Sequence, residues 1–297
     1  MTRELAFLRP RSIPEAVALL AEHGDEAKVV AGSTALTIML RNRLIDPAVL
    51  VSIAGIPGLA ERRVEGGVLH LGALATHRQV ERDPGVRSAL PVVADTFAKV
   101  ANVRVRNAAT VGGVMAEADY ASDPPAVFLG LDAVIVAEGP PGVRRIPAAE
   151  FFVAFYETSL RPDEIVTGVE VPLPPPGTGT HYEKFVTRSS EDRPCVGVFA
   201  AVRRLADGSY GDVRVAVGAA AETPQRFPDL EASAAGTDLG DDVRRSIADG
   251  YAGRIETLDD VRGSAWYRTE MVRVWVRRAL ERAREQAAGA GASGAVA

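Results

Sequence analysis

The stretch 107-NAATVGGVMAEADYASDPPAVFLGLDAVIV-136 decides how this chain folds. Two adjacent glycines, Gly112 and Gly113, follow a Thr-Val pair, and a run of small residues then leads to a Ser-Asp pair before the apolar segment begins. A glycine loop of this kind lets the backbone approach a neighbour that a side chain would obstruct. The neighbour is either a bound ligand or another packed element of the same chain.

A second loop of small residues, 31-AGSTAL-36, follows a short β-branched strand. Successive N–H groups in such loops can form a concavity that binds an anion, and a diphosphate would suit both. For either loop alone, a tight turn between packed elements is the better interpretation.

A formal G-x-G-x-x-G at 289–294 follows a helix rather than a strand, so we interpret it as chance. No Walker lysine follows any glycine loop, which argues against a nucleoside-triphosphate site.

The composition is that of a folded globular protein of two or three units: 297 residues, 47% hydrophobic and 25% charged. The net charge of −5 provides no basic field, so no nucleic-acid or anionic-membrane partner is expected. No stretch approaches the ~18–20 apolar residues of a membrane span, and the N-terminal residues lack the apolar core of a secretory signal. The sequence therefore predicts a cytoplasmic protein without a membrane span.

A single cysteine, Cys195, excludes an internal disulfide, a four-thiolate iron–sulfur cluster and a cysteine-based zinc site. The four histidines show no HExxH or paired spacing, so no metal site is expected. Any iron–sulfur chemistry linked to this protein must therefore lie on another chain.

Local patterns predict several elements. Ser12 and Glu15 form the pattern of a capping box at the start of a helix. Residues 88–105 have the apolar character of one buried helix, and 264–286 that of a long amphipathic helix. The segment 172-PLPPPGTGTH-181, with four prolines and two glycines, predicts a domain boundary.

Several runs together resemble a known family. These are 31-AGSTALTIMLRNRLIDPAVLVSIAGIPGL-59, 104-RVRNAATVGGVMAEADYASDPPAVFLGLDAVIV-136, 146-IPAAEFFVAFYETSLRPDEIVTGVEVP-172, 182-YEKFVTRSSED-192, 218-GAAAETPQR-226 and 264-SAWYRTEMVRVWVRRAL-280. The chain resembles, over nearly its whole length, the FAD-binding medium subunit of the molybdenum hydroxylases, the xanthine dehydrogenase and aerobic carbon monoxide dehydrogenase family.

The resemblance implies an α+β fold: a two-lobed FAD-binding domain of the vanillyl-alcohol-oxidase/PCMH type, followed by a smaller α/β domain. On this basis we expect lobe 1 at residues 1–55, lobe 2 at 56–175, the C-terminal domain at 180–287 and a disordered tail at 288–297. In the family, two glycine loops jointly bind the FAD diphosphate. The residues that match them are Ala31, Gly32, Ser33, Thr34 and Ala35 in the first loop, and Thr110, Val111, Gly112, Gly113 and Val114 in the second.

Three further residues match positions near the cofactor. Ser122 and Asp123 match the place where a carboxylate contacts the adenosine ribose, and an acceptor-only side chain suits a vicinal diol. The alternative is that Asp123 caps the turn before the following prolines. Lys184, four residues before Arg188, matches a lysine near the flavin ring, where a cation stabilises reduced anionic flavin and raises its potential. The alternative for Lys184 is a solvated strand residue, and His77 is interpreted as structural.

The chain departs from the family pattern at four positions. Ser33 stands where a glycine is usual, and Ala35 where an acidic or polar residue is usual. Val114 replaces an asparagine, which removes a hydrogen-bonding group near the cofactor, and Arg193 stands where a bulky apolar residue covers the flavin face. A serine still presents its N–H group, so FAD binding is expected to persist.

The resemblance implies an electron-transfer flavoprotein subunit. A large partner subunit with a molybdenum cofactor hydroxylates the substrate, a small partner with [2Fe–2S] clusters relays electrons, and FAD on this chain passes them to NAD⁺, a quinone, O₂ or another acceptor. The expected assembly is a heterotrimer or its dimer. Two alternatives stay open: a stand-alone FAD-dependent oxidase or dehydrogenase, and a non-catalytic scaffold that has lost FAD.

Overall fold

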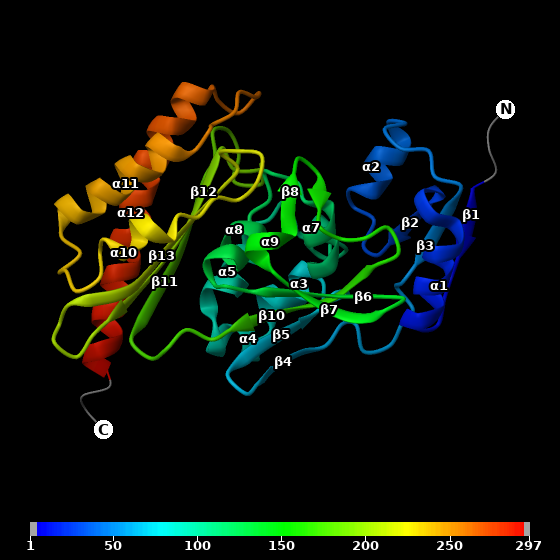
Figure 1. The fold of residues 1–297 in the computed structure, drawn as a ribbon, viewed down its shortest axis with the longest axis horizontal. Coiled ribbons are helices and arrows are strands. Elements are labelled where there is room, and N and C mark those ends of the chain that lie inside the picture. Colours follow the sequence, from blue (N-terminus) through cyan, green and yellow to red (C-terminus); the bar gives the residue numbers. More distant parts are fainter. Residues whose placement is uncertain (1–4, 294–297) are drawn as a thin grey trace.

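The computed structural model describes residues 5–293. Three units lie in a row: an N-terminal unit (lobe 1), a central unit (lobe 2) and a C-terminal domain (Figure 1). Each unit has its own sheet. The central unit also contains a separate two-stranded hairpin of β8 (Phe152–Ala154) and β9 (Glu157–Thr158). The α+β class predicted from the sequence is confirmed.

Lobe 1 is a three-stranded parallel sheet in the order β1-β3-β2, with a helix against it. Its elements are β1 (Ala6–Leu8), α1 (Ile13–His23), the 3-10 turn η1 (Gly24–Glu26), β2 (Ala27–Val30), α2 (Leu36–Arg41) and β3 (Val49–Ser52). Helix α1 buries one apolar face, including Ala16 and Leu20, because these positions recur at helical spacing.

The start of α1 differs in detail from the predicted capping box. The Ser12 hydroxyl accepts from the Glu15 N–H at 3.3 Å, as expected. The Glu15 carboxylate, however, accepts from the N–H of Arg11 at 2.7 Å rather than from that of Ser12. The reciprocal bond is therefore displaced by one residue. The N–H groups of Arg11 and Glu15 both still have side-chain acceptors at the start of the helix.

Lobe 2 is an antiparallel sheet in the order β4-β5-β10-β6-β7. The strands are β4 (Arg62–Glu65), β5 (Val68–Gly72), β6 (Val134–Gly139), β7 (Gly142–Pro147) and β10 (Ile165–Pro172). Alternate residues such as Leu69, Leu71 and Ile135 are buried under helices, whereas His70 and Glu170 point to the other face. The helices are α3 (His77–Arg82), α4 (Pro84–Ala89), α5 (Pro91–Ala98), α6 (Val103–Arg106), α7 (Val111–Glu117), α8 (Pro124–Gly130) and α9 (Ala148–Phe151).

The prediction of one buried helix over 88–105 is wrong. Helix α4 ends at Ala89, and α5 begins at Pro91, because proline has no N–H to continue a helix but fits its first position. Helix α5 ends before Lys99, and the Asn102 side chain then caps a separate helix, α6, by accepting two backbone N–H groups. The predicted burial holds for α5, whereas α6 has no buried residue and Val103 is exposed.

The C-terminal domain is an antiparallel sheet of β11 (Thr178–Phe185), β12 (Val196–Arg204) and β13 (Tyr210–Gly218). Helices α10 (Pro228–Ala232), α11 (Asp241–Arg254) and α12 (Ala265–Ser293) pack on it (Figure 1). The proline-rich break joins β10 to β11. Helix α12 extends to Ser293, so the first six residues of the predicted disordered tail are helical, and the rest of that tail lies outside the described residues.

The C-terminal domain has its own apolar core, and one face of its sheet also packs into the core of lobe 2. Helix α8 lies beneath β12 and β13, and Phe199 of β12 belongs to the same buried cluster as Phe128 of α8. A polar link accompanies this packing: the hydroxyl of Tyr120 donates to Asp260 at 2.7 Å, and the fully buried Arg268 pairs with the same carboxylate. No helix among residues 5–293 is long and apolar enough to cross a membrane.

Candidate functional site

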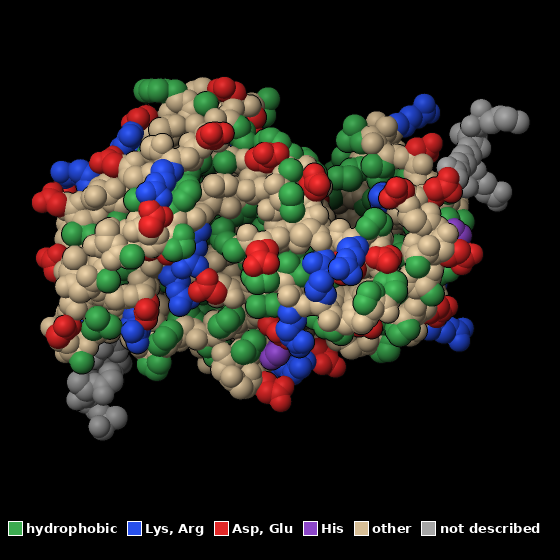
Figure 2. Space-filling view, in the orientation of Figure 1, with side chains coloured by type: hydrophobic (Ala, Val, Ile, Leu, Met, Phe, Trp, Pro, Cys, Tyr) green, Lys and Arg blue, Asp and Glu red, His purple; other side chains and the backbone are tan. Residues whose placement is uncertain are grey.

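A cavity of about 920 Å³ lies where the three units meet. Its walls come from the loop 31–36 and α2 of lobe 1, from α7 and the loop after it in lobe 2, and from 184–193 of the C-terminal domain. The space-filling view shows the surface hollowed between lobe 1 and lobe 2 (Figure 2). Ligand sites commonly occupy about 300–1,000 Å³, so this cavity is large enough for an extended ligand.

The first loop offers unsatisfied backbone donors. Among the described residues, no hydrogen-bond acceptor was found for the N–H groups of Gly32 through Leu36. A Cβ on Gly32 would overlap the carbonyl oxygen of Ala108, so only glycine lets the two loops approach this closely. Ser33 adopts a left-handed φ of +58°, which explains why glycine suits this position. A run of free N–H groups beside a cavity can bind an anion.

The second loop does not offer such donors. The N–H groups of Val111 and Gly112 donate to carbonyl oxygens of the 73–75 segment at 2.9 and 2.8 Å, and Gly113 donates to the Thr110 hydroxyl at 3.1 Å. A Cβ on Gly112 would lie 2.6 Å from a side-chain atom of the same segment. The expectation of free N–H groups in both loops is therefore wrong for this one. Its glycines allow α7 to pack closely at the end of β5.

Asp123 and Lys184 form a buried ion pair in the cavity wall. The Lys184 ammonium donates to Asp123 at 3.0 Å and to the carbonyl oxygen of Lys99 at 2.7 Å, and the hydroxyl of Tyr182 donates to the other Asp123 oxygen at 2.8 Å. The side chains of the pair are only 4% and 6% exposed. Lys184 is therefore no solvated strand residue.

This pairing conflicts with the two roles predicted for its members. Asp123 was assigned to the adenosine ribose and Lys184 to the flavin ring, and a diphosphate separates these groups in an extended FAD molecule. An ion pair of 3.0 Å brings both side chains to one point of the cavity. The two predicted roles are thus incompatible for an extended cofactor.

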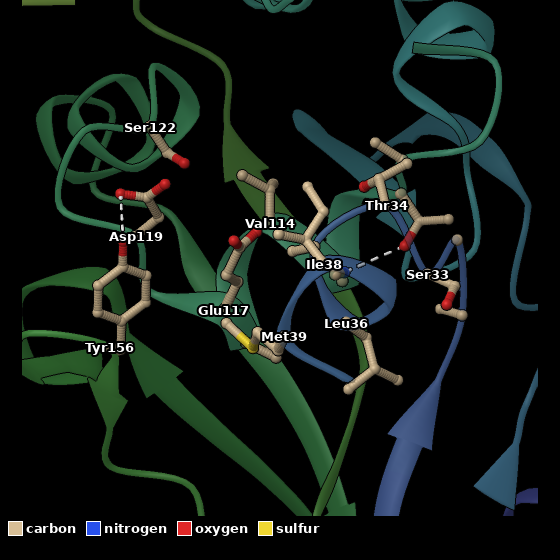
Figure 3. A pocket seen from close by; sticks show the side chains of 18 of the residues that line it. Ser33, Thr34, Leu36, Ile38, Met39, Val114, Glu117, Asp119, Ser122 and Tyr156 are labelled. Atoms are coloured by element: carbon tan, nitrogen blue, oxygen red, sulfur yellow. Dashed lines mark hydrogen bonds between the residues drawn. The ribbon is translucent and has the colours of Figure 1, made fainter. Parts of the chain in front are cut away.

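A second charged cluster in the cavity was missed from the sequence. Asp119, buried in the loop after α7, accepts from the Ala121 N–H at 3.1 Å and from the Tyr156 hydroxyl at 3.4 Å (Figure 3). Arg193 Nη2 lies 2.6 Å from its other oxygen, so this departure from the family pattern reaches across to lobe 2. The sequence signal for this cluster is the pair of acids within the small-residue run 116-AEADYA-121.

Glu117, the last residue of α7, lines the same cavity. Burial, and then repulsion by Asp119, raise its pKa to about 7, although Arg193 opposes the shift. Ser122 also lines the cavity, close to these acids (Figure 3).

The remaining predicted residues have clear places. Thr34 and Ala35 lie at the start of α2 and line the cavity, as does Ala31. Val114, which replaces a usual asparagine, is 8% exposed and belongs to the core of lobe 2. His77 is buried with its Nε2 3.3 Å from the carbonyl oxygen of Thr110, as expected of a structural residue.

Two family models match the chain. The model described as "FAD binding domain in molybdopterin dehydrogenase" matches residues 3–174, and "CO dehydrogenase flavoprotein C-terminal domain" matches 181–283. The chain is an FAD-binding medium subunit of the molybdenum hydroxylase family. It is therefore an FAD-dependent oxidoreductase subunit, and its fold and cofactor agree with the prediction.

Relatives of this medium subunit match it over most of its length. It is 34% identical to the nicotine 6-hydroxylase medium subunit of Paenarthrobacter nicotinovorans, covering 93% of this chain and 96% of the relative. It is 34% identical to the carbon monoxide dehydrogenase medium chain of Hydrogenophaga pseudoflava, covering 92% and 95%. A solved structure of that carbon monoxide dehydrogenase, lacking the Mo-pyranopterin moiety, matches with a TM-score of 0.92 at 33% identity, over 96% of this chain and 99% of the other.

The cavity of this medium subunit fits FAD. Its volume and its position at the junction of both lobes suit an elongated dinucleotide, and the free N–H groups of the first loop suit a diphosphate. The cradle that a Cβ on Gly32 would fill lies beside these donors.

Proposed function

We propose that this subunit accepts electrons from the [2Fe–2S] clusters of a small partner subunit and passes them to NAD⁺, a quinone, O₂ or another acceptor. A large partner subunit with the molybdenum cofactor oxidises the substrate, and the three chains form a heterotrimer or its dimer in the cytoplasm. The names of the relatives support this, since they are medium subunits and chains of such dehydrogenases and hydroxylases. The flavin supplies the redox chemistry.

The observation that carries the proposed FAD site is the run of free backbone N–H donors in the first loop. The backbone N–H groups of Gly32 to Ala35 bind the diphosphate, and Gly32 gives the close approach to lobe 2. The second loop, from Thr110 to Val114, forms the opposite wall by packing and shape.

The flavin ring lies toward the C-terminal domain in this proposal. Lys184 belongs to that domain, and its ion pair with Asp123 adds a rigid polar group to the wall there. Because the two side chains lie together, we assign both to the flavin end, and the adenosine extends toward lobe 1. The pair holds a fixed charge distribution near the ring, which is how the protein tunes a flavin potential.

Absorption spectroscopy tests the cofactor site. The purified chain, before and after FAD is added, should show the bands of oxidised flavin, and chromatography of the released cofactor should identify FAD rather than FMN. A colourless chain that takes up no FAD, alone or with its partner chains, would contradict the site.

Co-purification tests the relay. A tagged chain expressed with its neighbouring genes should retain a molybdenum-containing chain and an iron–sulfur chain, and reduction of those clusters should bleach the flavin. Turnover of an organic substrate by the isolated chain would instead favour the stand-alone flavoenzyme.

A further inference from the structure

Glu117 is a half-buried carboxyl group in the cavity. It ends α7, and the next residue, Ala118, has a left-handed φ of +47° that turns the chain toward Asp119. Both acids line the cavity, two residues apart (Figure 3). The C-terminal end of a helix carries a partial negative charge, so it does not favour an ionised carboxylate there.

The nearby donors serve Asp119 and leave Glu117 without one. The Ala121 N–H, the Tyr156 hydroxyl and the Arg193 guanidinium all contact Asp119. In the part of the chain that the structure describes, no hydrogen bond or ion pair to the Glu117 carboxyl was found. An ionised carboxylate in a partly desolvated place without a donor is unfavourable, whereas a neutral carboxylic acid is tolerated there.

The titratable groups around Glu117 come from three elements, and two of these groups, Asp119 and Arg193, are charged. The loop after α7 contributes Asp119, the turn between β8 and β9 contributes Tyr156, and the loop between β11 and β12 contributes Arg193. The cavity side chains of α2, such as Ile38 and Met39, are uncharged (Figure 3). Burial and Asp119 outweigh Arg193 and raise the Glu117 pKa to about 7, so the free protein holds this proton only in part at neutral pH.

The cofactor brings more negative charge into this cavity. A diphosphate carries two negative charges, and FAD also excludes water from the walls that it contacts. Both effects disfavour the ionised form of Glu117. We propose that Glu117 takes up a proton when FAD binds and, as a neutral acid, donates a hydrogen bond to an oxygen of the cofactor. The proposal rests on the FAD site proposed above.

Proton uptake makes FAD affinity depend on pH. Below about pH 6 Glu117 already carries its proton, so the affinity is constant there. Above pH 7 the protein must first gain the proton, and the FAD dissociation constant rises toward about tenfold per pH unit. Glu117→Gln keeps the shape and a donor but cannot ionise, so its affinity should stay level over the same range.

Titration calorimetry measures the proton directly. FAD is titrated into the apoprotein at pH 8 in HEPES and in Tris, whose ionisation enthalpies differ, and the difference in heat gives the number of protons exchanged. We expect about one proton taken up by the wild type and none by Glu117→Gln. The matched control is Glu150→Gln, which changes an exposed carboxyl group that does not line the cavity and should behave like the wild type.

The outcomes separate this proposal from the site itself. Wild-type protein that binds FAD without proton uptake at pH 8 would overturn the role of Glu117 and leave the FAD site standing. The same conclusion follows if Glu117→Gln takes up as many protons as the wild type. If the wild type binds no FAD at either pH 6 or pH 8, both alone and with its partner chains, the proposed site is wrong and this proposal with it. The wild-type measurement needs no variant, so a poorly folding variant does not decide the test.

Discussion

Ser33 shows how one residue can depart from a family pattern at an identifiable cost. Its left-handed φ costs a residue with a Cβ about 1–2 kcal/mol, and its hydroxyl lies 2.9 Å from that of Thr37. From the sequence, Ser33 departs from the family pattern and FAD binding is still expected. Only the structure shows that the usual glycine suits the backbone conformation at this position.

Replacing Ser33 by glycine should therefore raise the free energy of unfolding by up to about 1 kcal/mol and leave FAD binding intact. Urea denaturation of the apoprotein measures this. Ser33→Ala is the matched control, because it also loses the hydroxyl contact but keeps the Cβ. Equal stability of the two variants would contradict the conformational argument.

His77 is a buried base whose charge state links stability to pH. Burial lowers its pKa to about 4, below the ordinary value of 6.5, although its bond to Thr110 opposes this. Between pH 6.5 and 4 the unfolded chain binds a proton that the folded chain does not, so this residue's contribution to stability falls as pH falls through that window. The total is on the order of 3 kcal/mol.

The substitution His77→Gln should remove that dependence. Glutamine can still donate toward Thr110 but takes no proton, so the difference in unfolding free energy between wild type and variant should shift in favour of the variant as pH is lowered from 6.5 to 4.5. Urea denaturation at several pH values measures it. A difference that stays constant over this range would show that His77 does not carry the effect.

At the scale of elements, the two glycine loops differ in a way that their sequences do not reveal. Both have small residues, and both were predicted to present free N–H groups. The first loop follows the end of an edge strand, so its N–H groups have no neighbouring strand to pair with. The second runs past the 73–75 segment, whose carbonyl oxygens take its N–H groups. Which acceptors lie nearby is a tertiary property.

The substitution Gly32→Ala tests the contact between these elements. The new Cβ would meet the backbone of Ala108, so the loops must separate; we expect a loss of about 2 kcal/mol in unfolding free energy and at least tenfold weaker FAD binding. Gly55→Ala is the control, because a Cβ there meets nothing within 4 Å. Thermal unfolding and an FAD titration measure the two effects. Wild-type affinity in Gly32→Ala would mean that the loop approach is not needed for the cofactor.

At the scale of the whole molecule, a buried polar cluster joins the C-terminal domain to lobe 2. Burial alone would raise the pKa of Asp260, but hydrogen bonds from Tyr120, the Arg262 N–H and Arg268 outweigh it and hold this pKa well below its usual range. Arg268 has no exposed surface, and Asp260 is its acidic partner. The cluster thus fixes one wall of the cavity relative to the others.

The substitution Asp260→Asn should destabilise the protein by about 3 kcal/mol, because it leaves the Arg268 charge buried without its partner. Chemical denaturation measures the loss, with Asp242→Asn as the control, since the Asp242 carboxylate is 97% exposed and its ion pair is worth little. A loss below about 1 kcal/mol would indicate that the carbonyl oxygens of Cys195 and Ala219 suffice for Arg268.

The sequence alone was enough to identify the family by resemblance, and with it the fold class and FAD, because the resemblance rests on runs of residues that are contiguous in the chain, such as the two glycine loops. The tertiary structure decided what those segments do: it paired Asp123 with Lys184, brought Arg193 to Asp119, and used the donors of one loop while leaving those of the other free. These contacts join residues far apart in the chain. Their partners, burial and charge depend on packing between units, which no local pattern encodes.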